Sequence, residues 1–159
     1  MAVRAADGQE LMEALQPGPE GEDGYVLEDQ IGFRLRKAHQ RATDIFNSVM
    51  GGFDVTPTQF AALAKLDDVG PVPQNHLGRL VAMDPATIFG VVGRLAKRGL
   101  VESRVDGKDA RVVLVALTDE GRAAVVGMKA VAAEVSRRTL APLSAREAET
   151  LLRLIAKIG

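Results

Sequence analysis

One stretch of strand-forming residues interrupts a chain whose other segments have helical periodicity. Residues 106–121 read DGKDARVVLVALTDEG, which is a charged turn containing a glycine, followed by an unbroken run of β-branched and aliphatic residues. Apolar and polar side chains partly alternate over the preceding residues 100–105. These patterns predict a β-hairpin with strands at 100–105 and 112–117 and a loop at 106–110. One hairpin among helices restricts the chain to a mainly α fold of the α+β class.

The segments before the hairpin have the features of helices. Residues 26–50 place apolar side chains on a narrow arc at helical spacing, and the glycine pair that starts at Gly51 ends this predicted helix. Thr56 and Gln59 have the spacing of a capping box, and Pro57 stands at the first helical position. A second helix is therefore predicted to begin at Pro57.

Two further helices are predicted before the hairpin. The first is short and covers residues 73–81. Its core-facing residues are expected to be Leu77, Leu80 and Val81. Asp84 and Pro85 have the residue types of an N-cap and a first helical position, and Gly99 suits a left-handed residue at the end of a helix. The second helix is therefore predicted to run from Pro85 through residue 98.

Two helices are also predicted after the hairpin. Thr118 is a suitable N-cap, and the carboxylates of the next two residues lie where the helix dipole favours negative charge. This helix is expected to extend through residue 138. Ser144 and Glu147 form a second capping box, which begins the last helix. The apolar residues of that helix are Leu151, Leu152, Leu154, Ile155 and Ile158.

The composition excludes several classes of function. The chain has no cysteine, which rules out disulfides, thiol redox sensing, cysteine nucleophiles and cysteine-rich zinc sites. Two histidines, His39 and His76, are too few for most histidine-based metal centres. We therefore expect no catalytic residue, no metal and no cofactor. No apolar run approaches the roughly 20 residues of a membrane-spanning helix, and no signal pattern is present, so a cytoplasmic protein with no membrane partner is expected.

The net charge of −1 conceals an uneven distribution. Residues 1–29 contain one basic and eight acidic side chains, so the remaining 130 residues carry a net charge of +6. Residues 1–24 are acidic and rich in glycine and proline towards their end. We expect them to form a flexible leader, because they offer little apolar surface to offset the entropy lost on ordering.

The order of helix, short helix, helix and hairpin is that of a winged helix-turn-helix. In such a motif the second of two closely connected helices enters the major groove of DNA. Residues 73–111 contain seven basic and four acidic side chains, a net charge of +3. The positive charge thus overlaps the predicted DNA-binding unit, as expected when phosphate contacts supply much of the affinity. Double-stranded DNA is the predicted partner.

The charged residues of the hairpin have two interpretations. Arg104 and Lys108 flank the turn, where a hairpin tip can place them on backbone phosphates. Arg111 lies two residues after Asp109, so this pair can instead brace the turn and fix the shape of the wing. The alternative is that the tip is charged only because it is solvated.

The residues of this region resemble the multiple-antibiotic-resistance regulator (MarR) family of winged-helix repressors. The resemblance covers residues 26–158. It rests on Asp109, Arg111, Leu114, Leu117, Thr118 and Gly121, and upstream on Asp84, Pro85, Ala86, Thr87, Leu95 and residues 97–101. It implies a homodimer that binds a pseudo-palindromic operator and is usually released by a small ligand.

The resemblance also implies a domain organisation. A single domain is expected over residues 25–159, after the leader at 1–24. Within it the winged helix-turn-helix occupies about residues 55–118, and N- and C-terminal dimerisation helices occupy about residues 26–50 and 119–158.

By the same resemblance, the start of the helix at 84–98 faces base edges. The DNA-binding residues expected are Gln74, Asn75, His76, Pro85, Ala86, Thr87, Phe89, Gly90, Arg94, Arg104, Lys108, Asp109 and Arg111. Thr87 can contact a base edge or a thymine methyl group, although it can instead cap its helix with Asp84. Phe89 is expected to pack in the core rather than stack on a base. Relatives often have polar residues at positions 89 and 90, so direct base contacts are expected to be few and DNA shape to contribute more.

The resemblance places an effector pocket between the dimer helices and the DNA-binding part of the fold. Arg34, His39 and Arg41 border the apolar arc of the first predicted helix. Such groups suit an aromatic carboxylate or its acyl thioester, for example an acyl-CoA, which needs apolar burial and a charge-assisted hydrogen bond. The alternative is that the arginines extend their apolar stems along the helix border and that the histidine is only hydrogen-bonded.

Two other functions compete with a repressor. An enzyme is disfavoured because no catalytic grouping, metal-ligand spacing or phosphate-binding glycine loop is present. A winged-helix domain that binds another protein stays open, because a fold does not fix a function.

Overall fold

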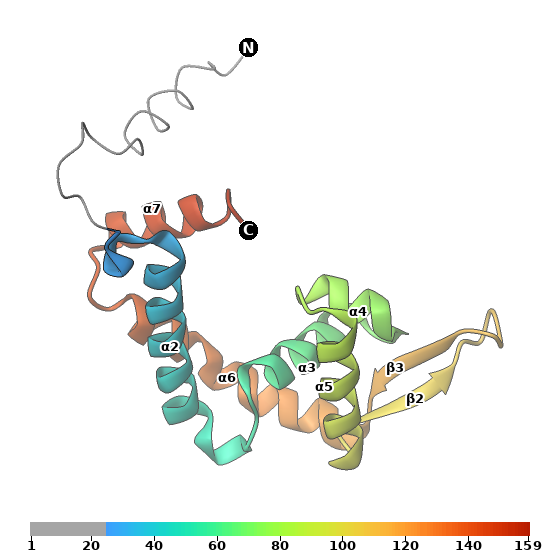
Figure 1. Ribbon diagram of the computed structural model, residues 1–159. Coiled ribbons are helices and arrows are strands. Elements are labelled where there is room, and N and C mark those ends of the chain that lie inside the picture. Colours follow the sequence, from blue (N-terminus) through green and yellow to red (C-terminus); the bar gives the residue numbers. More distant parts are fainter. Residues whose placement is uncertain (1–24) are drawn as a thin grey trace, which may run out of the picture. The chain divides into compact units, whose positions relative to one another are not determined.

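The computed structural model describes residues 25–159 (Figure 1). The acidic leader predicted for residues 1–24 lies outside this range. The chain divides into two compact units, Met1–Lys37 and Ala38–Gly159, and the boundary falls inside helix α2. No helix within the described range is long and apolar enough to cross a membrane.

The first unit contains a short 3-10 helix, η1 (Leu27–Asp29), and the beginning of α2 (Ile31–Met50). The prediction of one helix from residue 26 is therefore wrong at its start. Gln30 separates the two helices because its backbone is extended, with φ −75° and ψ 131°. The Gln30 carbonyl accepts the first hydrogen bond of α2, from the backbone N–H of Arg34 at 3.0 Å. The predicted end of the helix before Gly51 is confirmed.

In the second unit, a 3-10 turn η2 (Gly51–Phe53) is followed by α3 (Pro57–Val69), α4 (Gln74–Leu80) and α5 (Pro85–Lys97). The capping box of α3 is confirmed, because the Thr56 hydroxyl accepts from Gln59 N–H at 3.2 Å and the Gln59 side chain accepts from Thr56 N–H at 2.9 Å. Asp84 caps α5 as predicted, and Gly99 has the left-handed φ of 71°.

The sheet has three antiparallel strands in the order β1-β3-β2. The predicted hairpin is confirmed as β2 (Val101–Val105) and β3 (Val113–Leu117), and Figure 1 shows it projecting beside α5. The third strand, β1 (Val72–Pro73), was not predicted. It pairs with β3 through Val72 opposite Val115 and is too short to produce an alternating pattern of its own.

The core of the second unit lies between α3, α4, α5, the sheet and α6 (Asp119–Leu140). Its fully buried side chains include Leu63, Leu77, Ile88, Val91, Leu95, Val125 and Met128. The prediction that Leu80 faces this core is wrong, because α4 packs through Leu77 and Gly78 and Leu80 lies about 200° around the helix from Gly78. Lys129 of α6 bonds Asp67 and Asp68 of α3, each at 2.6 Å.

The last helix, α7 (Ala145–Ile155), begins at the predicted capping box. None of its residues is buried, although one side of it is strongly apolar. Its exposed large apolar side chains are Leu151, Leu152, Leu154 and Ile155. Ile158, which lies beyond the end of the helix, is also exposed.

Candidate nucleic-acid interface

Helix α5 separates an inward and an outward face clearly. Ile88, Val91, Val92 and Leu95 follow helical spacing and are buried. The outward side of the first two turns has small or apolar residues instead, and most of them are exposed. These residues are Pro85, Ala86, Thr87, Phe89, Gly90 and Gly93. Nothing else in the second unit covers this side, so a partner can approach it.

Thr87 is held by the cap of its own helix. Its backbone N–H donates to Asp84 Oδ1 at 2.9 Å, and its hydroxyl donates to Asp84 Oδ2 at 2.6 Å. These bonds to Thr87, the side-chain bond first, lower the pKa of the Asp84 carboxyl. The capping alternative is therefore realised. Because the hydroxyl is bonded to Asp84, Thr87 would contact a base through its methyl group, and that contact stays a prediction.

Phe89 does not pack in the core. Its side chain is 70% exposed, so the expectation of core packing is wrong. The reason is geometric: Ile88 and Val91 already supply the inward face, and Phe89 lies about 100° around the helix from Ile88. The outward face of α5 therefore includes a large exposed aromatic side chain.

The tip of the hairpin is shaped by its own side chains. Arg111 donates two guanidinium hydrogen bonds to the carboxylate of Asp109, at 3.0 and 3.1 Å, and its backbone N–H donates a third at 3.0 Å. This confirms the predicted brace. The Arg111 side chain lowers the pKa of Asp109, and Asp109 raises the pKa of Arg111. The Arg111 side chain remains 90% exposed.

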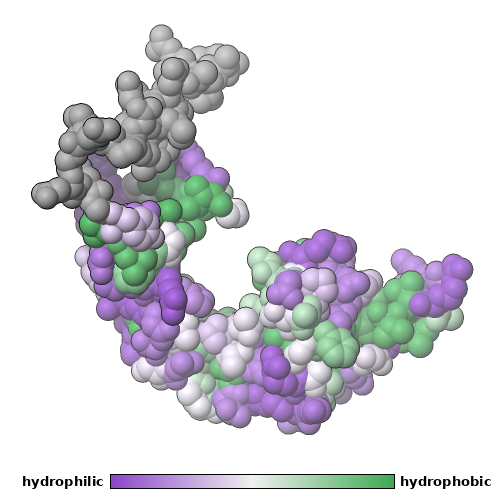
Figure 2. Space-filling view, viewed as in Figure 1, coloured by the Kyte–Doolittle hydropathy of each residue, from purple (hydrophilic) through white to green (hydrophobic). Residues whose placement is uncertain are grey.

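The other two basic residues of the wing differ in their surroundings. Arg104 donates to Glu102 on the same strand at 2.6 Å. Lys108 has no ion-pair partner within residues 25–159. Figure 2 shows hydrophilic surface at the tip and apolar surface over the strands below it. The exposed apolar residues of these strands are Val105 and Val113.

The start of α4 lies near the start of α5. Gln74 is half-buried, and Asn75 and His76 are exposed. Asn75 and Pro85 line the same surface cavity of about 310 Å³, together with residues of the turn between the two helices. The predicted contacts at residues 74–76 and 85–87 thus belong to one continuous surface.

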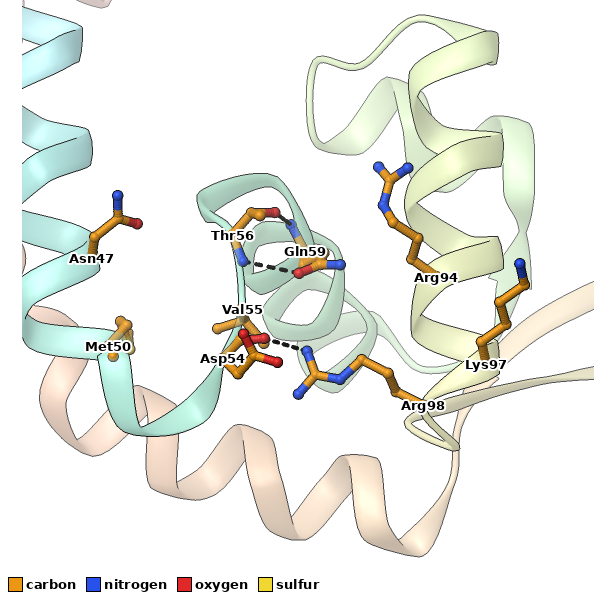
Figure 3. A pocket seen from close by; sticks show the side chains of 10 residues that line it. Asn47, Met50, Asp54, Val55, Thr56, Gln59, Arg94, Lys97 and Arg98 are labelled. Atoms are coloured by element: carbon orange, nitrogen blue, oxygen red, sulfur yellow. Dashed lines mark hydrogen bonds between the residues drawn. The ribbon is translucent and has the colours of Figure 1, made fainter.

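A larger cavity of about 540 Å³ opens at the other end of α5 (Figure 3). Three cations at the end of α5 line it, namely Arg94, Lys97 and the C-cap residue Arg98, and the opposite wall comes from α2, η2 and the start of α3. Arg98 donates to the carbonyls of Phe53, at 3.1 Å, and of Asp54. Sequence reasoning selected only Arg94 of these residues, although positions 94, 97 and 98 share one side of a helix at i, i+3 and i+4.

The three predicted ligand-binding residues lie on α2 and are exposed. Arg34 donates to Asp29 at 2.8 Å within the first unit. His39 and Arg41 belong to the second unit, and neither lines the cavity of Figure 3. Their role in ligand binding stays a prediction.

Comparisons with known proteins agree with this geometry. The sequence model of the MarR family matches residues 55–113. The HTH-type transcriptional repressor NicR of Pseudomonas putida is 39% identical over 134 residues, which cover 84% of this chain and 85% of NicR.

Two solved structures are similar in both sequence and fold. A probable transcriptional regulator from Pseudomonas aeruginosa is 51% identical with a TM-score of 0.80, over 84% of this chain and 100% of the other. Bordetella bronchiseptica BpsR, whose DNA binding is described as regulated by 6-hydroxynicotinic acid, is 34% identical with a TM-score of 0.79, over 85% of this chain and 96% of BpsR.

Proposed function

The chain belongs to the MarR family of DNA-binding transcriptional regulators, and from this premise we propose that it is a homodimeric repressor of a pseudo-palindromic operator. A small anionic aromatic ligand, or its acyl thioester, releases it from the DNA. The observation that carries the proposal is the open outward face of α5 beside a cationic hairpin. Such a protein acts on DNA in the cytoplasm.

In this proposal α5 lies in the major groove and the hairpin lies against the backbone or the adjacent minor groove. Pro85, Ala86, Thr87 and Phe89 face base edges, because they lie on the outward side of the first turns. The residues assigned to phosphate are Gln74, Asn75, His76, Arg94, Arg104, Lys108 and Arg111. Asp109 acts indirectly, by holding Arg111 in place.

A homodimer follows from the apolar residues that a single chain leaves exposed on α7. Isolated apolar residues are common on protein surfaces, but an apolar side of a helix without any buried residue requires a partner surface. A two-fold dimer would place two copies of α5 about one turn of DNA apart. This spacing matches the half-sites of a pseudo-palindrome.

The DNA-binding proposal is tested by selection from a random pool of duplexes, followed by binding measurements at two salt concentrations. We expect the selected sequences to contain inverted half-sites. Affinity for them should fall steeply with salt, because phosphate contacts release counterions. Absence of any sequence-selective binding at low salt would instead favour a winged-helix domain that binds another protein.

Two sets of residues are candidates for binding an anionic effector. One consists of the predicted residues Arg34, His39 and Arg41, each taken by itself, and the other is the cavity lined by Arg94 and Lys97. That BpsR responds to a hydroxylated aromatic carboxylic acid supports the proposed ligand class. The ligand releases the repressor from DNA if it binds more tightly to a dimer in which the spacing of the two α5 helices does not match the half-sites. A preference of about 1.4 kcal/mol changes the ratio of the two states about tenfold.

The effector is tested by thermal shift with a panel of aromatic acids and their thioesters. A ligand that binds the folded chain raises Tm. We expect Arg34→Ala, His39→Ala or Arg41→Ala to remove the shift, whereas the Arg94→Ala, Lys97→Ala double variant should keep it. If the double variant lost the shift and the three single variants kept it, the ligand would be assigned to the cavity of Figure 3. No shift with any compound would contradict the proposed ligand class.

A further inference from the structure

The outward face of α5 almost lacks groups that recognise bases by hydrogen bonds. Ala86, Phe89, Gly90 and Gly93 follow the spacing i, i+3, i+4 and i+7, so they form one stripe along the helix. We call these four residues the α5 stripe. The stripe contains no amide, guanidinium, carboxylate or hydroxyl group. The hydroxyl of neighbouring Thr87 donates its proton to Asp84.

Positive charge follows the α5 stripe on its own helix and occurs again at the tip of the wing. Arg94 follows the stripe directly on the same helix, and the wing with Lys108 and Arg111 projects beside α5 (Figure 1). An exposed aromatic residue alone is common on protein surfaces. An apolar stripe next to cations suits the major groove, which combines phosphates at its edges with one apolar group on the bases. That group is the C5 methyl of thymine.

The glycines leave Phe89 as the only large side chain of the stripe. A Cβ atom added at Gly93 would meet no protein atom within 4 Å. The space outside Gly93 is therefore open to a bound partner. A Cβ atom at Gly90 would lie 3.2 Å from the Arg94 guanidinium, so the absence of a side chain there lets Arg94 lie over the helix. The helix backbone can thus enter the groove closely while Phe89 reaches further.

We propose that Phe89 is a specificity-determining residue that recognises thymine C5 methyl groups in each half-site. This inference rests on the proposed operator binding. Because Ala86 and the two glycines are small, the helix can enter the groove, and Phe89 buries the methyl groups of one or two thymines. The operator is then recognised by its methyl pattern and by its shape more than by side-chain hydrogen bonds.

The test uses the full chain and a duplex selected from a random pool. Each thymine of a half-site is replaced in turn by deoxyuridine, which removes only the C5 methyl group and keeps every hydrogen-bonding group of the base. We expect the wild-type chain to lose about fourfold in affinity for each methyl group that it buries, from the usual value of a buried methyl or methylene group. At thymines outside the contact, uracil should have no effect.

Variants of the chain assign the effect to Phe89. Phe89→Ala should bind thymine and uracil duplexes equally at the sensitive positions, whereas Phe89→Leu should keep part of the preference. Lys108→Ala is the matched control. It should bind every duplex more weakly and with a smaller salt dependence, but it should keep the full wild-type preference for thymine over uracil. Because Phe89 is exposed, its substitution should leave Tm nearly unchanged, which a melting curve of each variant checks.

The outcomes separate this inference from the proposed function. If no duplex is selected, operator binding itself fails and this inference fails with it. If a duplex is selected but uracil has no effect at any position, or if Phe89→Ala keeps the wild-type preference, only the role of Phe89 is overturned. Unchanged affinity of Phe89→Ala for every duplex would likewise overturn the role of Phe89.

Discussion

At the tip of the wing, Asp109 accepts three hydrogen bonds from a residue only two positions away. These bonds hold the Arg111 guanidinium in one orientation while most of its surface stays in water. At the start of α5, Asp84 similarly accepts two hydrogen bonds from Thr87. Both carboxylates therefore fix the local shape of the surface that is proposed to bind DNA.

Arg111→Ala should weaken operator binding and reduce the slope of log affinity against log salt by about 2, because each subunit of the dimer loses one phosphate contact. Tm should change little, since exposed ion pairs contribute little to stability. Asp109→Asn should weaken binding less and leave the slope unchanged, because the cation remains while its brace is lost. A salt titration of the three proteins measures both quantities. Wild-type affinity and slope in Arg111→Ala would contradict the role assigned to this residue.

At the scale of elements, one junction joins α5, the hairpin and α6. The Thr118 hydroxyl donates to the Gly99 carbonyl at 2.6 Å, and the Thr118 backbone N–H donates to the Leu100 carbonyl at 3.2 Å. The same hydroxyl accepts from Gly121 N–H at 2.9 Å and caps α6. The end of the DNA-binding helix and both ends of the hairpin are thus tied together, which fixes the wing relative to α5.

The junction leaves no room for a side chain at residue 121. A Cβ atom added to Gly121 would lie 1.9 Å from the Leu100 carbonyl oxygen. We expect Gly121→Ala to lower the free energy of unfolding by about 1–3 kcal/mol, because the backbone must shift. Gly32→Ala is the control, a helical glycine where an added Cβ meets nothing within 4 Å, and it should not destabilise the chain. Equal denaturation midpoints for Gly121→Ala and wild type would refute the close contact.

Helix α6 has its own ionic cluster near its C-terminal end. Glu134 accepts from Arg137 at 2.6 and 2.7 Å and from Arg138 at 2.5 Å. These bonds, those of Arg137 first, lower the pKa of the Glu134 carboxyl from 4.5 to about 2. A lowered folded-state pKa means that the pairing stabilises the helix fully above pH 4.5 and is lost as the pH falls towards 2.

An NMR titration of the Glu134 carboxyl carbon should therefore have its midpoint at about 2. The double variant Arg137→Gln, Arg138→Gln should move the midpoint up towards 4.5, the value without these partners. An identical Glu134 midpoint in both proteins would show that the arginines do not set this pKa.

At the scale of the whole molecule, the apolar side of α7 is an exposed surface within residues 25–159. Leu151 and Ile155 lie close together on this side, within about 40° around the helix, and both are exposed. Operator recognition by two half-sites depends on the dimer that this surface is proposed to form. Subunit association and DNA affinity should therefore change together.

The double variant Leu151→Glu, Ile155→Glu should sediment as a monomer, because two carboxylates would have to be buried without partners. Its affinity for a full operator should fall to about its affinity for a half-site, since linkage of the two sites is lost. Glu149→Ala, about 160° away from Leu151 and about 120° away from Ile155 on the same helix, should remain a dimer. Sedimentation at several concentrations measures the mass, and an unchanged mass of the double variant would refute this surface.

Much of this fold was predictable because its determinants are local. The capping boxes at Thr56 and Ser144, the left-handed Gly99 and the Asp109–Arg111 pair each involve residues a few positions apart. A hydrogen bond between such neighbours needs no contact from the rest of the chain, so residue types and spacing are sufficient to predict it. The family resemblance also depends on these short patterns.

The remaining features depended on segments far apart in the sequence. Strand β1 exists because Val72 pairs with Val115, and Phe89 is exposed because the core accepts the side of α5 that holds Ile88. The cavity beside Arg94 requires the end of α2 to lie opposite α5. The sequence by itself thus determined the capped helix starts, the hairpin and its braced tip. Only the tertiary structure decided which side chains are buried and which cations meet, because burial and cavities arise from packing between distant segments.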